Sequence, residues 1–357
     1  MQVLHIVAPS DPLTSPEIMG LVRVTQQQVG GQHKTLVIGG DVETKYLRSC
    51  GIPVLGSVPG PMDASKTLAS RVNRLIELHS EGNLLNVIAW GWSATTMLCG
   101  LETSVRKIGF VDGIHHSVSR SSIDFTVIPS SWRGSDVLVD SGINSNVIAE
   151  PLIGVEPTSC VADRSIVEDE LQIDNTNRFV YVVGNRSSWQ EILEMVFRMH
   201  STGMELVFIL PPYYAYRGRL MLEAKKRGLG KFIISTPAKL RSIDVLVHAD
   251  CVWAPDAASF DTTSTVLDVL KAAWEHVPIA AQCTHPVHSV PTLGSNIAWA
   301  RDSIDVSSWI IDCIRGTNRA GTRASEVNAS VRSIAAPSRF IEGLLQRISA
   351  NALLRCS

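Results

Sequence analysis

Short apolar runs alternate with helical patterns along almost the whole chain. Runs rich in Val, Ile and Leu, with no polar residue between the apolar ones, are typical of parallel strands buried on both faces. The intervals between them have the spacing of amphipathic helices. The pattern therefore predicts repeated β-α-β units, which form parallel sheets covered by helices. The predicted strands are 3–9, 34–40, 52–58, 86–92, 107–114 and 124–130, followed by 179–185, 205–212, 231–235, 250–255, 277–282 and 295–300.

The first predicted helix has clear start signals. Ser15 is placed as its N-cap, Pro16 at its first position and Glu17 in its first turn. Further helices are predicted near 65–80, 93–105, 132–142, 189–201, 215–227, 263–275 and 304–315.

The β-α rhythm breaks at residues 156–178, which are polar and suit a linker containing one short helix over 164–172. We therefore predict an α/β protein of two facing Rossmann-like, doubly wound parallel-sheet domains. The first covers 1–156 and the second 157–335, and a final helix over 336–357 can cross back to the first. Ligands of such sheets bind at the carboxyl ends of the strands, which predicts one cleft between the domains.

Composition narrows the function classes. The 357 residues have 18% charged side chains and a net charge of −2, so no nucleic-acid partner is predicted. The seven cysteines are scattered, odd in number and without CxxC pairs, which indicates reduced thiols, a cytoplasmic location and no zinc site. The start "MQVLHIVAP" lacks the basic leader of a signal peptide. Peripheral membrane contact stays open, since Arg71 and Arg74 are too few to predict a lipid surface, and no oligomeric state is predicted.

Several catalytic motifs are missing. The loop after the first strand has no GxGxxG, which disfavours a nicotinamide dinucleotide, and no P-loop or GxSxG elbow occurs. The stretch "CTHPVH" (283–288) lacks partner ligands, so no metal site is predicted. The histidines at 5, 33, 79, 200 and 248 show no clustering in the sequence and are expected to be structural or exposed.

Residues 260–281 carry the most informative chemistry. A strand enters a polar loop and then a helix with Thr262 and Thr263 as N-cap candidates. Free backbone N–H groups of its first turn, around Ser264 and Thr265, would attract a phosphate without a cationic side chain. Asp268, about a turn further on, could accept hydrogen bonds from sugar or ribose hydroxyls. The alternative is an ordinary capped helix with a solvated aspartate.

From its first strand to its last helix the chain resembles the group 1 (family 4-like) glycosyltransferases, which are retaining enzymes of the GT-B fold. The stretch "TVLDVLKAAWEHVPIA" falls on their signature, with Asp268 at its second glutamate. Other matches are "FVYVVGN" (179–185) at the first strand of the nucleotide-binding domain and "FVDGIHHSVSRS" (110–121) at the histidine motif.

The resemblance implies roles for particular residues. His115 would line the reaction centre, and Asp268 with Asp261 would bind donor hydroxyls, although the signature's first glutamate falls on Phe260. The diphosphate would meet Asn185 and Arg186 together with the helix start at Thr263, Ser264 and Thr265. The main chain around Thr236 and Pro237 would hold the nucleotide base. No cofactor or metal is implied, since the nucleotide-diphosphate-sugar is itself the donor substrate.

Two functions follow from these observations. The first is a retaining glycosyltransferase that uses a nucleotide-sugar donor and an acceptor of unknown identity. The second is a catalytically inactive GT-B relative that binds a sugar-nucleotide or glycan, or serves as a partner subunit. The inactive relative is favoured by the missing lysine of the resemblance, whose place is taken by Gln190. A periplasmic-type solute-binding protein shares the architecture but would need an export signal.

Overall fold

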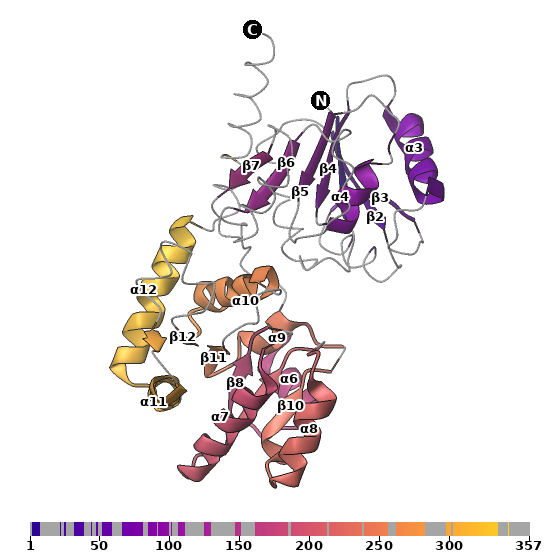
Figure 1. Cartoon of the computed structure of the whole chain (residues 1–357). Helices are drawn as coiled ribbons and strands as arrows, with labels where there is room; N and C mark the ends of the chain where they lie inside the picture. The colour runs from indigo at the N-terminus through magenta and orange to yellow at the C-terminus, as the bar shows by residue number, and fades with distance from the viewer. Residues whose placement is uncertain are drawn as a thin grey trace. The chain divides into compact units, whose positions relative to one another are not determined.

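The computed structural model describes the cores of two compact units (Figure 1). Unit 1 comprises residues 1–156 and 335–357, and unit 2 comprises residues 157–334. The described residues are 2–7, 32–38, 52–58, 66–80, 85–90, 92–99, 106–110, 125–129, 147–150, 161–184, 187–212, 214–237, 239–255, 262–282, 298–300 and 303–334, with single positions at 22, 25, 44, 48, 101 and 342.

Unit 1 contains a seven-stranded sheet, sheet A, whose order is β3-β2-β1-β4-β5-β6-β7. All its strand pairs are parallel. The chain therefore builds outward from β1 in one direction, then returns to the other side of β1 with β4. The strands are β1 (Gln2–Val7), β2 (Gln32–Ile38), β3 (Val54–Val58), β4 (Leu85–Trp90), β5 (Arg106–Phe110), β6 (Phe125–Pro129) and β7 (Val147–Glu150).

One face of sheet A packs against two helices, α3 (Lys66–Ser80) and α4 (Trp92–Cys99). Strand side chains alternate between faces, so only every second residue of β1 reaches this core. The cluster joins Leu4, Ile6, Leu36 and Val87 of the sheet to Val72 and Ile76 of α3 and to Ala94 and Leu98 of α4.

Unit 2 contains a six-stranded parallel sheet, sheet B, whose order is β10-β9-β8-β11-β12-β13. This is again the 3-2-1-4-5-6 order of doubly wound folds. The order in which strands are added reverses between β8 and β11, although all strands remain parallel. The strands are β8 (Arg178–Val182), β9 (Leu206–Leu210), β10 (Ile233–Ser235), β11 (Cys251–Ala254), β12 (Ile279–Gln282) and β13 (Ala298–Ala300).

Helices cover both faces of sheet B. One face packs against α7 (Trp189–Ser201), α8 (Arg217–Lys226) and α11 (Ser303–Ile314) in the main core of the unit. The opposite face, which carries Tyr181, meets α9 (Ser242–Leu246) and α10 (Thr262–Trp274). The unit also contains α6 (Arg164–Leu171), the short helix η1 (Gly230–Phe232), and α12 (Asn318–Ile334), which lies against α10 (Figure 1).

Every predicted strand is found within a few residues of its expected place, and the α/β class with two doubly wound sheets is confirmed. The pattern missed β7, α9 and α12. The helix predicted over 132–142, and most of those predicted over 336–357 and from Ser15 onward, lie outside the described residues. In the part of the chain that the structure describes, no helix combines the length and apolar character needed to cross a membrane.

Candidate functional site

The carboxyl edge of sheet B is the candidate site in unit 2. Strands β8 and β11 are parallel neighbours, so the loop after Val182 and the loop after Ala254 leave the sheet at the same edge. The first loop leads to α7 on one face and the second to α10 on the other. Open α/β sheets bind their ligands at such a reversal of strand order.

The ends of the β8 loop are firmly held. Gly184 has φ of 93°, a left-handed conformation that a side chain would disfavour. The Ser187 hydroxyl donates to the Gly184 carbonyl at 3.1 Å, and the Tyr214 hydroxyl donates to the Ser187 carbonyl at 2.7 Å. Ser188 then caps α7 by accepting from the Glu191 N–H at 3.4 Å. The predicted diphosphate residues between these anchors, Asn185 and Arg186, lie outside the described residues.

Helix α10 begins at Thr262 and carries no acidic residue in its first turn. Thr262 is the first helical residue and Thr263 the second. The prediction that one of them is the N-cap is therefore wrong, because an N-cap precedes the first helical residue. The first N–H groups of a helix have no partner within it and carry the positive end of its dipole. The main chain of Thr263, Ser264 and Thr265 is thus placed at the start of the helix, as the phosphate prediction requires.

Asp268 lies in the second turn of α10 with its side chain 14% exposed. Its carboxylate is 3.5 Å from the Nζ of Lys271, whose side chain is 6% exposed. Beneath it on β8 is the fully buried Tyr181, and burial followed by the Asp268 charge raises the pKa of that phenol well above its usual range. Ser242 of α9 is near enough to oppose this rise, but no hydrogen bond to the Tyr181 hydroxyl is completed. Asp268 is therefore a half-buried charge between α10 and β8. Asp261, which is predicted to bind donor hydroxyls together with Asp268, lies outside the described residues.

The predicted base-binding loop starts where β10 ends. Thr236 is buried, and its N–H and hydroxyl both donate to the Leu210 carbonyl, at 3.0 and 2.7 Å. The Pro237 carbonyl accepts the N–H of Leu240 at 3.0 Å. Thr236 therefore anchors the loop to β9 and has no donor left for a base, so any contact with a base falls to the remaining main chain of this loop.

In unit 1, His115 lies outside the described residues, but another histidine pair is found in the core of sheet A. His5 Nε2 is 3.1 Å from His33 Nδ1, and Trp90 Nε1 donates to His5 Nδ1 at 3.1 Å. Burial, and then the charge of His33, lower the pKa of His5 from 6.5 to about 3. The expectation that these histidines do not cluster is wrong, because the parallel register places His33 next to Val3 and so on the same face as His5. Strand register is not visible in a sequence.

Among the described residues no group of three His, Cys, Asp or Glu side chains could hold a metal ion. The metal-like stretch 283–288 lies outside them.

Comparison with known proteins finds no match by sequence and clear matches by fold. No family model matches the chain, and no curated protein matches it in sequence. Among solved structures, HepE from Anabaena in complex with UDP-glucose superposes with a TM-score of 0.70 at 14% identity, over 98% of this chain and 100% of that one. The glycosyltransferase from Rickettsia africae has a TM-score of 0.68 at 11% identity, over 97% of each chain. Sucrose-phosphate synthase from Thermosynechococcus elongatus has a TM-score of 0.62 at 10% identity, over the whole of both chains.

The chain has the GT-B fold. The resemblance to GT-B glycosyltransferases stated from the sequence is thereby confirmed at the level of the fold. At such low identities the likeness concerns the fold alone.

Proposed function

We propose that this GT-B protein is a glycosyltransferase that moves a sugar, with retention, from a nucleotide-diphosphate-sugar donor to an acceptor. The observation that carries the proposal is the position of the α10 start beside the β8 loop, at the reversal of strand order in sheet B. The complexes of HepE with UDP and with UDP-glucose support a donor of this class.

In this proposal the diphosphate rests on the first-turn N–H groups of α10, at Thr263, Ser264 and Thr265, which are preorganised for the charge that develops on the leaving group. Asn185 and Arg186, between the anchored ends of the β8 loop, add polar contacts. Because main-chain donors meet the charge, the proposal requires neither a metal nor a cofactor.

Three further side chains would act on the sugar. Asp268 and Asp261 accept hydrogen bonds from donor hydroxyls, and His115 lines the reaction centre. The half-buried position of Asp268 suits this role, since a carboxylate partly removed from water binds hydroxyls more strongly.

A catalytically inactive relative remains a second candidate because of Gln190. It stands where the resemblance has a lysine, and its side-chain oxygen accepts the Ser188 hydroxyl at 3.2 Å at the start of α7. A neutral side chain engaged in this way supplies no cation to a diphosphate.

The first prediction separates the two candidates. Purified protein incubated with a panel of nucleotide-sugars should release nucleoside diphosphate from at least one donor, and faster when an acceptor is added. Coupled detection of free UDP or GDP measures this, and boiled protein is the control. Tight binding of a nucleoside diphosphate without turnover of any donor would support the inactive relative instead.

A further inference from the structure

Both main-chain groups of Ala162, near the start of unit 2, are held by side chains far along the chain. Its N–H donates to Asp244 Oδ1 at 3.1 Å, and its carbonyl lies 2.8 Å from His248 Nε2. Asp244 belongs to α9, and His248 lies two residues after the end of this helix. The position of residues 161–163 is therefore set by α9.

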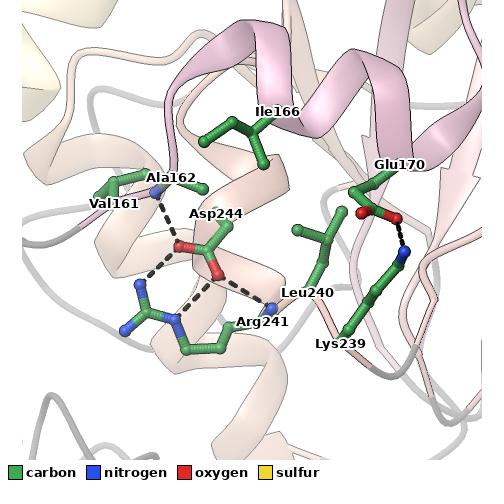
Figure 2. Close-up of a pocket in the computed structure, with 8 residues that line it drawn as sticks. All are labelled: Val161, Ala162, Ile166, Glu170, Lys239, Leu240, Arg241 and Asp244. Atoms are coloured by element: carbon green, nitrogen blue, oxygen red, sulfur yellow. Dashed lines mark hydrogen bonds and ion pairs between the residues drawn. The ribbon is translucent and has the colours of Figure 1, made fainter.

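The same carboxylate also holds the end of the loop that precedes α9. Asp244 Oδ2 accepts the Arg241 N–H at 3.0 Å and the Arg241 Nε at 2.8 Å, while Oδ1 accepts Nη2 at 2.5 Å (Figure 2). Asp244 is only 4% exposed. Burial raises its pKa, but the hydrogen bonds from Arg241 and Ala162 outweigh burial and hold the pKa below its usual value. The carboxylate is thus charged at neutral pH, and it accepts hydrogen bonds from Ala162 and Arg241.

The loop of residues 236–241 is consequently fixed at both ends. Thr236 is anchored on the Leu210 carbonyl and Arg241 on Asp244. A second tie joins Lys239 to Glu170 of α6 by an ion pair (Figure 2). One cavity of about 460 Å³ is lined by residues of both segments: Val161, Ala162, Ile166, Glu170, Lys239, Leu240, Arg241 and Asp244. A displacement of the loop would therefore carry the start of unit 2 with it.

We propose that Asp244 is a positioning residue that couples this loop to residues 161–163, so that a nucleotide base seated on the loop restrains the start of unit 2. The base-binding half of this inference rests on the proposed function. The coupling itself rests on one charged carboxylate that accepts hydrogen bonds from both Arg241 and Ala162.

The test compares Asp244→Asn with a matched control, Asp250→Asn. Asp250 also accepts an arginine, Arg178 at 2.7 Å, and a backbone N–H, that of Phe179 at 2.9 Å, but it does not touch the loop. Hydrogen exchange is followed by mass spectrometry on the full chain without ligand. Asp244→Asn should speed exchange about tenfold or more in both 161–166 and 239–243, since it replaces charged hydrogen bonds. Asp250→Asn should leave both segments unchanged.

Exchange in Asp244→Asn that rises at 161–166 while the loop stays as in the wild type would overturn the coupling. Arg241→Lys guards against a variant that fails to fold, because it keeps the charge but loses the planar two-point contact with the carboxylate. It should speed exchange in the same two segments, and by less.

A second arm adds UDP as the probe. In the wild type UDP should slow exchange in both the loop and residues 161–166, whereas in Asp244→Asn it should slow only the loop. Protection of the loop alone in the wild type would overturn the inference and leave the proposed function standing. Absence of any protection by UDP would overturn the proposed use of UDP together with the base-binding half, and the ligand-free arm would still decide the positioning role.

Discussion

At the scale of single residues, the bonds that join His5, His33 and Trp90 fix where protons reside in the core of sheet A. The Trp90 N–H donates to His5 Nδ1, so a neutral His5 must carry its proton on Nε2 and donate it to His33 Nδ1. His33 Nδ1 is then an acceptor. A proton added to Nδ1 of His5 would place this donor against the Trp90 N–H, which agrees with the lowered pKa of His5.

This arrangement predicts a loss of stability in mild acid. The folded pKa of His5, about 3, is below its unfolded value of 6.5, so the unfolded chain binds the proton first. The contribution is complete above pH 6.5 and is lost as pH falls towards 3. Between pH 7.5 and pH 5.0 it amounts to about 2 kcal/mol, at about 1.4 kcal/mol per pH unit. Urea unfolding at the two pH values measures it.

The matched variants are His5→Phe, which cannot titrate, and His200→Gln, which changes an exposed histidine of α7. His5→Phe should be less stable at pH 7.5 and should show a difference between the two pH values that is smaller by about 2 kcal/mol. His200→Gln should keep the wild-type difference. An unchanged pH dependence in His5→Phe would show that His5 titrates normally in the folded protein.

At the scale of elements, the hydrophobic pattern predicted strands and long helices well because each buries a continuous apolar stripe. Helix α12 was missed because its buried apolar stripe is thin, and among its described side chains it consists of Ala320, Val327 and Val331. Its contact with α10 is completed by a buried polar residue, Asn328, which donates to the carbonyls of Ala273 and Trp274 at the end of that helix. A side chain that satisfies the last carbonyls of another helix leaves no periodic signal in the sequence.

The start of α10 carries the element-scale prediction for ligand binding. Thr263→Pro removes one of the three N–H groups proposed to hold the diphosphate, in the first turn of α10, where proline is tolerated. Loss of one hydrogen bond to a charged phosphate, worth about 1.5–3 kcal/mol, should weaken UDP binding about ten- to a hundredfold. Isothermal titration calorimetry measures the affinity.

Ile304→Pro is the matched control, because Ile304 is the second residue of α11 as Thr263 is of α10. It should leave UDP affinity unchanged, and both variants should melt close to the wild type. Wild-type affinity in a folded Thr263→Pro protein would remove the α10 start from the site.

At the scale of the whole molecule, the sequence predicted the two doubly wound sheets that the structure shows, and it placed the candidate donor site at the carboxyl edge of the second one. Both follow from β-α alternation, which fixes parallel strands and hence a common carboxyl edge. Two features could not be predicted: the hydrogen bond that Ala162 donates to Asp244, and the contact of His5 with His33. They join residues 82 and 28 positions apart, and such contacts depend on strand order and register rather than on local pattern.

Because each unit has its own hydrophobic core, a donor bound in unit 2 should stabilise the two sheets unequally. A ligand at a hundred times its dissociation constant stabilises the folded state it binds by about 2.7 kcal/mol. With UDP at that ratio, the slowest-exchanging amides of β8, β9 and β11 should slow about a hundredfold, while those of β1, β2 and β4 should keep their rates. Native-state hydrogen exchange measures both sheets in one sample. It is run under conditions where the exchange rate of an amide is proportional to its opening equilibrium constant. Adenosine monophosphate without the diphosphate serves as the control ligand. Equal slowing in both sheets would show that the units unfold as one, and slowing in sheet A alone would place the nucleotide in unit 1.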